Sequence, residues 1–344
     1  MSEYRRDPFT GRWRIIAEGR SARPNDYAGP PAPKATDENC PFCEGHESRT
    51  PPETQAVREA GAPNGPGWTV RAIPNRFPSV AGDRPTGASG SPPPFEAAPG
   101  SGVHEVVIES PRHAPDLPYL EEDHLRVLFR LLRSRVRALA ARPGSAAVLL
   151  FENRGPESGG TLPHPHAQVL ATDLIPPRLE EERAAFRSGV GTPPARCRLE
   201  EVVANEAAAK TRLVVQDPLF TAFCPFASEF PFEVWIVPTR HSPEFGDATD
   251  AEVDGLAHLL PRILRALDVL RGRPSYNWFV HGLRGADAGA ENFHWHLELA
   301  PRIVRADAFE LGSGIPVNPV APEAAADAYR RQLAAADGPG RRKE

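Results

Sequence analysis

The sequence predicts an α+β protein in which two tandem repeats form an antiparallel sheet flanked by helices. One ordered set of elements, a strand, a helix, a strand and a His-x-His strand, occurs twice between His104 and His296. Such a repeat indicates duplication of one unit. Its apolar runs alternate only in part, which is typical of a sheet packed against helices on one face. The 344 residues, 40% of them apolar, can build a substantial core.

The first copy opens with a strand over residues 104–113 that ends at a histidine. Apolar side chains at helical spacing predict a helix over residues 125–139, which stops before a Pro-Gly pair. A strand over residues 147–151 follows. The copy closes on His164-Pro165-His166, which begins 51 residues after the leading histidine.

The second copy repeats this order. A strand over residues 232–241 also ends at a histidine, and a capping box at residues 249–252 starts a helix over residues 253–270. A strand over residues 276–280 leads to His294-Trp295-His296, which begins 53 residues after the leading histidine.

These repeats set the expected domain boundaries. We expect an N-terminal repeat at residues 1–175, a C-terminal repeat at residues 176–330 and a polar tail at residues 331–344. The stretch at residues 81–102 is rich in Pro, Gly and Ser, which predicts a loop between an N-terminal arm and the body.

Charge and hydropathy exclude several classes of protein. The net charge of -5 and the pI of about 6.2 provide no basic surface for a nucleic-acid polymer. The first residues lack the apolar core of a signal peptide, and no stretch of 18 consecutive apolar residues could span a membrane. We therefore expect a cytoplasmic protein that binds neither nucleic-acid polymers nor membranes.

A Cys-x-x-Cys pair, Cys40 and Cys43, lies in the proline-rich arm. Two thiolates at this spacing suit tetrahedral zinc, which needs two further ligands. No second pair of this kind exists, so histidines should complete the set, and His113 and His164 are best placed if the first repeat folds as described. The alternative is a redox pair, but no thioredoxin-like βαβ pattern surrounds it.

The segment from Gly159 to Gln168 points to chemistry at phosphorus. In an extended strand, His164, His166 and Gln168 would line one face. A neutral imidazole can attack phosphorus or bind a metal. The alternative is a chance His-Pro-His in a proline-rich loop.

Four motifs together resemble the galactose-1-phosphate uridylyltransferase family, a branch of the histidine-triad superfamily. They are Cys40-Pro41-Phe42-Cys43, Ser110-Pro111-Arg112-His113, Phe151-Glu152-Asn153-Arg154-Gly155 and His164-Pro165-His166-Ala167-Gln168. The resemblance implies two histidine-triad-like repeats that form a half-barrel sheet, and a homodimer. It also implies that His166 is the nucleophile and that zinc is held by Cys40, Cys43, His113 and His164.

The residue chemistry agrees with nucleotidyl transfer. Attack by an imidazole on the α-phosphorus of a nucleoside diphosphate sugar forms a phosphoramidate, which passes the nucleotidyl group onward and gives ping-pong kinetics. Gln168 cannot act as a general acid, but its amide can hydrogen-bond a phosphate oxygen. We expect His166 and Gln168 to be catalytic, with UMP moving from UDP-glucose to galactose 1-phosphate.

Further residues match substrate-binding positions of the family. Arg20 and Arg23 are suited to phosphates, although a solvated basic arm is the alternative in so arginine-rich a chain. Asn75 matches a nucleoside contact. The other candidates surround the phosphates, where glycine exposes backbone N–H groups; they are Asn153, Gly159, Gly160 and Thr161.

Some relatives imply a second metal site, for iron or zinc, at Glu182, His281, His294 and His296. Two more glutamates adjoin Glu182 on a predicted helix. A second repeat without metal is the alternative.

The C-terminal end departs from the family. Glu310 resembles a sugar-contacting glutamate, but the glutamine expected shortly after it is not recognisable. The stretch from Gly312 to Pro319 is closer to relatives such as ADP-glucose phosphorylase, in which phosphate accepts the nucleotide. Adenylyl transfer to phosphate is therefore one alternative function, and a nucleotide-binding protein without turnover is another.

Overall fold

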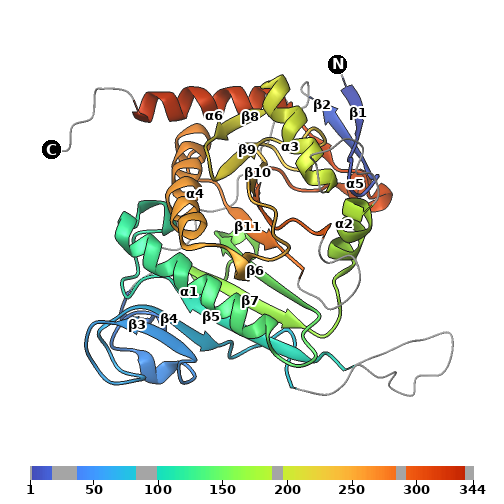
Figure 1. The fold of residues 1–344 in the computed structure, drawn as a ribbon. Coiled ribbons are helices and arrows are strands. Elements are labelled where there is room, and N and C mark those ends of the chain that lie inside the picture. The colour runs from blue at the N-terminus through green and yellow to red at the C-terminus, as the bar shows by residue number, and fades with distance from the viewer. Residues whose placement is uncertain (1, 18–36, 83–98, 188–196, 284–291, 338–344) are drawn as a thin grey trace.

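The computed structural model describes residues 2–17, 37–82, 99–187, 197–283 and 292–337. Ten antiparallel strands form one sheet that runs through both halves of the chain (Figure 1). From edge to edge, its strands are β3 (Gln55–Arg58), β4 (Trp68–Pro74), β5 (Gly102–Ile108), β7 (His166–Thr172), β6 (Ala147–Arg154), β11 (Tyr276–His281), β12 (His296–Pro301), β10 (Val234–Pro238), β9 (Phe220–Phe223) and β8 (Leu213–Gln216).

The two halves of the chain meet at the centre of this sheet. There β6 pairs with β11, and Asn153 lies opposite Asn277. In each half, one strand begins at the second histidine of the His-x-His motif and lies between two other strands of that half. β7 lies between β5 and β6, and β12 lies between β10 and β11.

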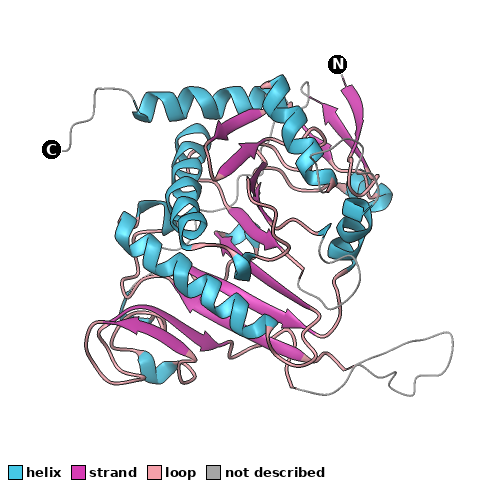
Figure 2. Ribbon diagram, viewed as in Figure 1, coloured by secondary structure: helices cyan, strands magenta, loops and turns pink. Residues whose placement is uncertain are grey.

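Helices α1 (Glu122–Ala140), α4 (Asp250–Arg271) and α6 (Pro322–Asp337) cover one face of the sheet (Figures 1 and 2). Strand side chains such as Leu150 and Trp278 join Phe129 of α1 and Leu260 of α4 in the main core. Because side chains alternate along a strand, the neighbours of these residues are directed to the opposite face.

The opposite face is covered differently in its two halves. Helices α2 (Pro177–Arg187) and α3 (Arg198–Ala209) cover the second half through Phe186 and Leu199. Over the first half lies the arm that carries the two cysteines, with Phe42 and Trp68 packed near Ile108. The candidate site lies on this face.

A small sheet near the N-terminus contains β1 (Ser2–Arg6), β2 (Trp13–Ala17) and β13 (Val317–Asn318), and α5 (Ala308–Ser313) precedes β13. Arg5 ties this sheet to the body by an ion pair of 3.0 Å with Glu323. Five short 3-10 helices complete the described elements: η2 (Asp37–Asn39), η3 (Glu47–Arg49), η4 (Leu117–Tyr119), η5 (Pro156–Ser158) and η6 (Phe245–Asp247).

The structure contains each helix and strand predicted for both copies, in the predicted order. The bounds differ at the histidines: β5 ends at Ile108, and β7 begins only at His166. Pro165 has no N–H to donate to the ladder, which explains why β7 cannot begin earlier. The predicted capping box at Thr249 and Glu252 starts α4.

The C-terminal region corrects one expectation. Helix α6 continues to Asp337, past the point at which a polar tail was expected, because Tyr329 and Leu333 are buried in the main core. Most of the predicted loop at residues 81–102 lies outside the described residues. Among the described helices, none has the length and apolar character that crossing a membrane requires.

Candidate active site and metal clusters

The four side chains predicted to bind zinc converge where the arm meets β5 and β7. Their ligand atoms all lie within 4.8 Å of one another. His164 Nδ1 is 3.5 Å from Cys40 Sγ and 3.6 Å from Cys43 Sγ, and His113 Nδ1 is 3.6 Å from Cys43 Sγ. Two thiols and two imidazoles are a donor set that zinc prefers. These residues therefore fit a zinc ion.

A backbone contact determines which nitrogen of His164 faces the thiols. His164 Nε2 lies 2.8 Å from the carbonyl oxygen of Ser110. A carbonyl oxygen only accepts hydrogen bonds, so Nε2 carries the hydrogen and Nδ1 keeps its lone pair for a metal.

His166 is oriented by the backbone of His164. Its Nδ1 donates to the His164 carbonyl oxygen at 2.7 Å, which leaves the lone pair on Nε2. Burial lowers the pKa of His166 below its ordinary value, and the hydrogen bond to His164 opposes this shift. The side chain keeps 9% exposure. A neutral imidazole with an accessible Nε2 has the form that attack on phosphorus requires.

Gln168 lies on the same face of β7 as His166 and contacts a histidine that sequence reasoning did not select. His104 Nε2 is 2.9 Å from Gln168 Oε1. His104 lies on β5, where Val106 pairs with Gln168 in the ladder. The register between two strands about 60 residues apart in sequence brings this pair together, and no local motif could have identified it.

A glycine-containing loop folds back over Asn153 at the end of β6. Gly155 and Gly159 both have φ of +83°, a conformation that favours glycine. Gly160 donates its N–H to the Gly155 carbonyl oxygen at 3.1 Å. Asn277 Nδ2 donates to Asn153 Oδ1 at 2.7 Å and to the Ser158 carbonyl oxygen at 3.0 Å. Asn277 therefore holds both the loop and the predicted phosphate ligand, and sequence reasoning did not select it either.

Asn75 lies beside the same imidazole as Gln168. Its Nδ2 is 3.3 Å from His104 Nε2, and its Oδ1 accepts from the Phe77 N–H at 2.8 Å. A surface pocket of about 570 Å³ adjoins this segment and the arm, with Pro41, Arg49 and Arg76 among its lining residues.

The remaining predicted substrate ligands are Thr161, Glu310, Arg20 and Arg23. Thr161 is exposed in the loop before His164. Glu310 lies in α5, where its carboxylate accepts from the backbone N–H groups of Asp307 at 2.6 Å and Val317 at 3.3 Å. Arg20 and Arg23 lie outside the described residues.

The second predicted metal site has a different fourth member. Glu182, His281 and His296 come together with Glu298 rather than with His294. Two carboxylates and two imidazoles can bind iron or zinc. Arg178 also reaches this cluster, with Nη2 2.6 Å from Glu298 Oε2.

His294 belongs to another cluster, with Cys197 and His241. Its Nε2 faces the Pro238 carbonyl oxygen at 2.9 Å, so Nδ1 faces Cys197 Sγ at 3.8 Å. This arrangement parallels that of His164, and Cys197, His241 and His294 could hold a metal. Cys197 has no Cys-x-x-Cys partner, so spacing along the chain does not mark it as a metal ligand. The correspondence of His241 with His113 in the repeat was the available signal.

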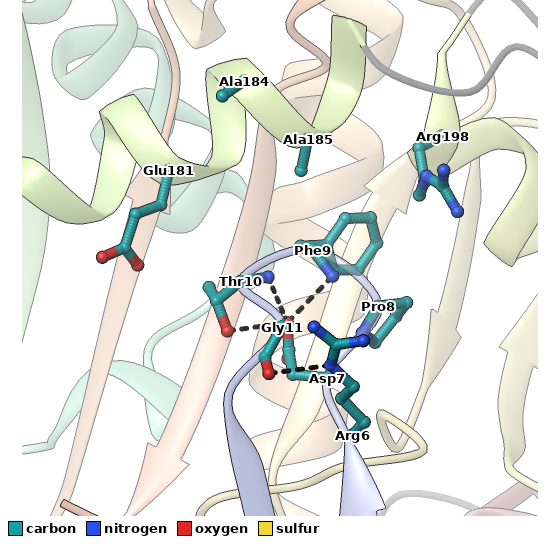
Figure 3. A pocket seen from close by; sticks show the side chains of 10 residues that line it. All are labelled: Arg6, Asp7, Pro8, Phe9, Thr10, Gly11, Glu181, Ala184, Ala185 and Arg198. Carbon is teal, nitrogen blue, oxygen red and sulfur yellow. Dashed lines mark hydrogen bonds between the residues drawn. The ribbon is translucent and has the colours of Figure 1, made fainter.

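A surface pocket of about 620 Å³ lies between α2 and the turn that joins β1 to β2 (Figure 3). In this turn, Asp7 Oδ1 accepts from the N–H groups of Phe9 at 2.9 Å and Thr10 at 2.7 Å. Arg6 and Arg198 line the pocket, but none of the predicted catalytic residues does.

Comparison with known proteins gives matches along nearly the whole chain. Residues 1–176 match the family model of the N-terminal domain of galactose-1-phosphate uridyl transferase. The chain is 30% identical to ADP-glucose phosphorylase of Arabidopsis thaliana over 338 residues, covering 95% of this chain and 92% of the relative. It is 29% identical to galactose-1-phosphate uridylyltransferase of Thermotoga maritima over 338 residues, covering 96% and 98%.

Solved structures agree with these matches. A crystal structure of an ADP-glucose phosphorylase from Arabidopsis thaliana with bound ADP-glucose matches with a TM-score of 0.78 at 26% identity, covering 96% of this chain and 99% of that one. The fold and the matches define a nucleotidyltransferase of the histidine-triad superfamily. The chain belongs to the galactose-1-phosphate uridylyltransferase family.

Proposed function

We propose that this protein transfers a nucleotidyl group from a nucleoside diphosphate sugar through a covalent intermediate on His166. The observation that carries this proposal is the orientation of His166, whose Nδ1 donates to the His164 carbonyl oxygen and whose Nε2 keeps its lone pair. His296 makes the corresponding contact with the His294 carbonyl oxygen at 3.0 Å. Its Nε2, however, lies 3.3 Å from Glu298 Oε1 and is therefore paired.

The reaction proceeds in two displacements. His166 Nε2 attacks the α-phosphorus, the bond to the bridging oxygen breaks, and the sugar 1-phosphate leaves. An oxygen of the second substrate then attacks the same phosphorus and frees the imidazole. Gln168 and Asn153 stabilise the phosphate oxygens. The N–H groups of Gly159 and Gly160 donate to the carbonyl oxygens of Pro156 and Gly155, each at 3.1 Å, so these two glycines shape the loop beside the phosphates.

Cys40, Cys43, His113 and His164 would hold zinc, which as a structural ion would fix the arm and the backbone on which His166 lies. Glu182, His281, His296 and Glu298 are the candidate ligands of a second ion. We assign no reaction step to either cluster.

Two substrate pairs fit the family. ADP-glucose with phosphate as acceptor is supported by the Arabidopsis relative and by the structure that contains ADP-glucose. UDP-glucose with galactose 1-phosphate is supported by the family model and by the Thermotoga relative. The missing glutamine after Glu310 favours the first pair.

The arrangement of the chain extends this proposal. We take residues 1–175 and 176–330 as two histidine-triad-like repeats, since their strands occupy equivalent places on either side of the β6–β11 junction. We also take the protein as a homodimer. Thr161, Asn75, Arg20, Arg23 and Glu310 stay proposed substrate ligands.

Labelling tests the covalent intermediate. The protein is incubated without acceptor with ADP-glucose or UDP-glucose that carries ³²P in the α-phosphate. We expect acid-labile, base-stable label on the protein with one donor, released on addition of phosphate or galactose 1-phosphate. The His166→Ala variant should take up no label, whereas the His258→Ala variant, altered at an exposed histidine of α4, should label normally.

Each result has a defined meaning. The donor that labels the protein identifies the nucleotide, and the acceptor that removes the label identifies the second substrate. Absence of label with both donors, or label retained by His166→Ala, would contradict the proposal. Tight nucleotide binding without release of glucose 1-phosphate would instead favour a binding protein.

A further inference from the structure

Two amide side chains face the place proposed for the phosphates, Gln168 on β7 and Asn153 on β6. An amide has an oxygen that accepts hydrogen bonds and an NH₂ group that donates them. Only the NH₂ group can stabilise a phosphate oxygen. If the oxygen of an amide is bound by a protein donor, its NH₂ group is the end that remains to bind a substrate.

The contacts of His104 determine the orientation of Gln168. The backbone N–H of Ser79 donates to His104 Nδ1 at 3.1 Å, so this nitrogen must carry the lone pair. Burial lowers the pKa of His104, with the Gln168 hydrogen bond opposing, and the ring is therefore neutral. Its single hydrogen lies on Nε2, which is 2.9 Å from Gln168 and can contact only the amide oxygen. The NH₂ group of Gln168 is therefore directed away from His104.

The contacts of Asn277 determine the orientation of Asn153 in the same way. One end of the Asn277 amide is 3.0 Å from the carbonyl oxygen of Ser158, which only accepts, so this end is Nδ2. The same Nδ2 is 2.7 Å from Asn153 and donates to its Oδ1. Asn277 and Asn153 are directly opposite in the β6–β11 ladder, which fixes this contact.

We infer that His104 and Asn277 are positioning residues that engage the amide oxygens of Gln168 and Asn153, so that both amides present only N–H donors to the substrate phosphates. Neither positioning residue needs to touch the substrate. The inference rests on the proposed function for the identity of the ligand, but the two oriented amides follow from the contacts themselves.

A double-mutant cycle between His104 and Gln168 tests the role of His104. His104→Phe keeps an aromatic ring and removes the N–H donor, whereas His104→Gln keeps a donor on a side chain of similar reach. We expect His104→Phe and Gln168→Ala each to slow formation of the labelled intermediate about 10-fold, the loss of one hydrogen bond. The double variant should be no slower than Gln168→Ala, and His104→Gln should recover most of the parent rate.

The same design applies to Asn277. Asn277→Leu has a similar size, carries no charge and cannot donate to Asn153. Combined with Asn153→Ala, it should cause less than its own full loss, because only its contact with the Ser158 carbonyl oxygen is then removed. Multiplied losses in the two double variants, or a His104→Gln variant as slow as His104→Phe at unchanged melting temperature, would overturn the inference.

A binding measurement separates this inference from the proposed function. Isothermal titration calorimetry with ADP and UDP measures how much the amide N–H donors contribute to nucleotide binding when no reaction takes place. The same non-additive pattern is expected in the dissociation constants. If the parent protein takes up no label but the binding cycle is non-additive, the covalent mechanism fails and the positioning role stands. If the parent protein labels and both cycles are additive, the positioning role fails.

Discussion

Gly160 has backbone on two sides of the place where a Cβ would be. An added Cβ would lie 2.8 Å from the Gly155 carbonyl oxygen and 2.9 Å from the Asn153 carbonyl oxygen. We expect Gly160→Ala to displace the loop and to lower kcat/KM about 10- to 100-fold, because a displacement near 1 Å is costly at a reacting centre. Gly312→Ala, where a Cβ meets nothing within 4 Å, is the control. Parent-like kinetics for Gly160→Ala would contradict this role of the loop.

Glu109 is buried at the end of β5, and its two carboxylate oxygens accept no hydrogen bond from the described part of the chain. Burial raises the pKa of Glu109 well above its ordinary value, and the charges of Glu152 and Asp116 raise it further. The folded state therefore holds a proton that the unfolded chain releases above its own pKa, so stability falls as pH rises toward the folded pKa.

Glu109→Gln removes this proton. We expect the free energy of unfolding of the variant, relative to the parent, to increase between pH 5 and pH 8 by about 1 kcal/mol or more, measured by urea denaturation. Any effect of the amide on the free energy of unfolding that does not depend on pH cancels when the two pH values are compared. Glu157→Gln should show no such increase, because Arg305 lowers the pKa of that exposed carboxyl. A difference that is flat with pH would show that Glu109 stays ionised.

At the scale of the element, the arm depends on its metal ligands. Its apolar cluster with β4 and β5 is small, so we expect zinc to contribute much of its stability. Cys40→Ala should lose one equivalent of zinc in metal analysis and lower the melting temperature. Cys224→Ala alters another buried cysteine and should keep the parent metal content. Unchanged zinc content in Cys40→Ala would exclude this cluster as a zinc site.

Helices α1 and α4 were predictable because the spacing of their apolar side chains is a local property of the chain. The Cys-x-x-Cys spacing and the position of His113 in the repeat likewise indicated four side chains that the structure brings together. His294 was grouped with His281 and His296 because the resemblance to some relatives implied a metal site there. It lies before β12 rather than on it, and its contact with Pro238 turns its ring toward Cys197.

At the scale of the whole molecule, the two halves share one sheet and one main core. Trp278 of the second half pairs with Glu152 of the first and packs against Phe129 of α1 at a ring distance of 6.4 Å. Separation of the halves would expose this core. We therefore expect one cooperative transition in urea, with tryptophan fluorescence and far-UV circular dichroism giving superimposable curves. Two resolved transitions would show that the halves fold independently.

The sequence by itself determined the order of the elements, four side chains that converge as a candidate zinc site, and the choice of His166 as the proposed nucleophile. The first two features are encoded in spacings along the chain, and the third comes from the resemblance of its motif to the family. The tertiary structure alone decided that His104 and Asn277 orient the amides of Gln168 and Asn153. The reason is that a cross-strand neighbour is set by the register between segments far apart in sequence, and that register depends on how the whole sheet packs.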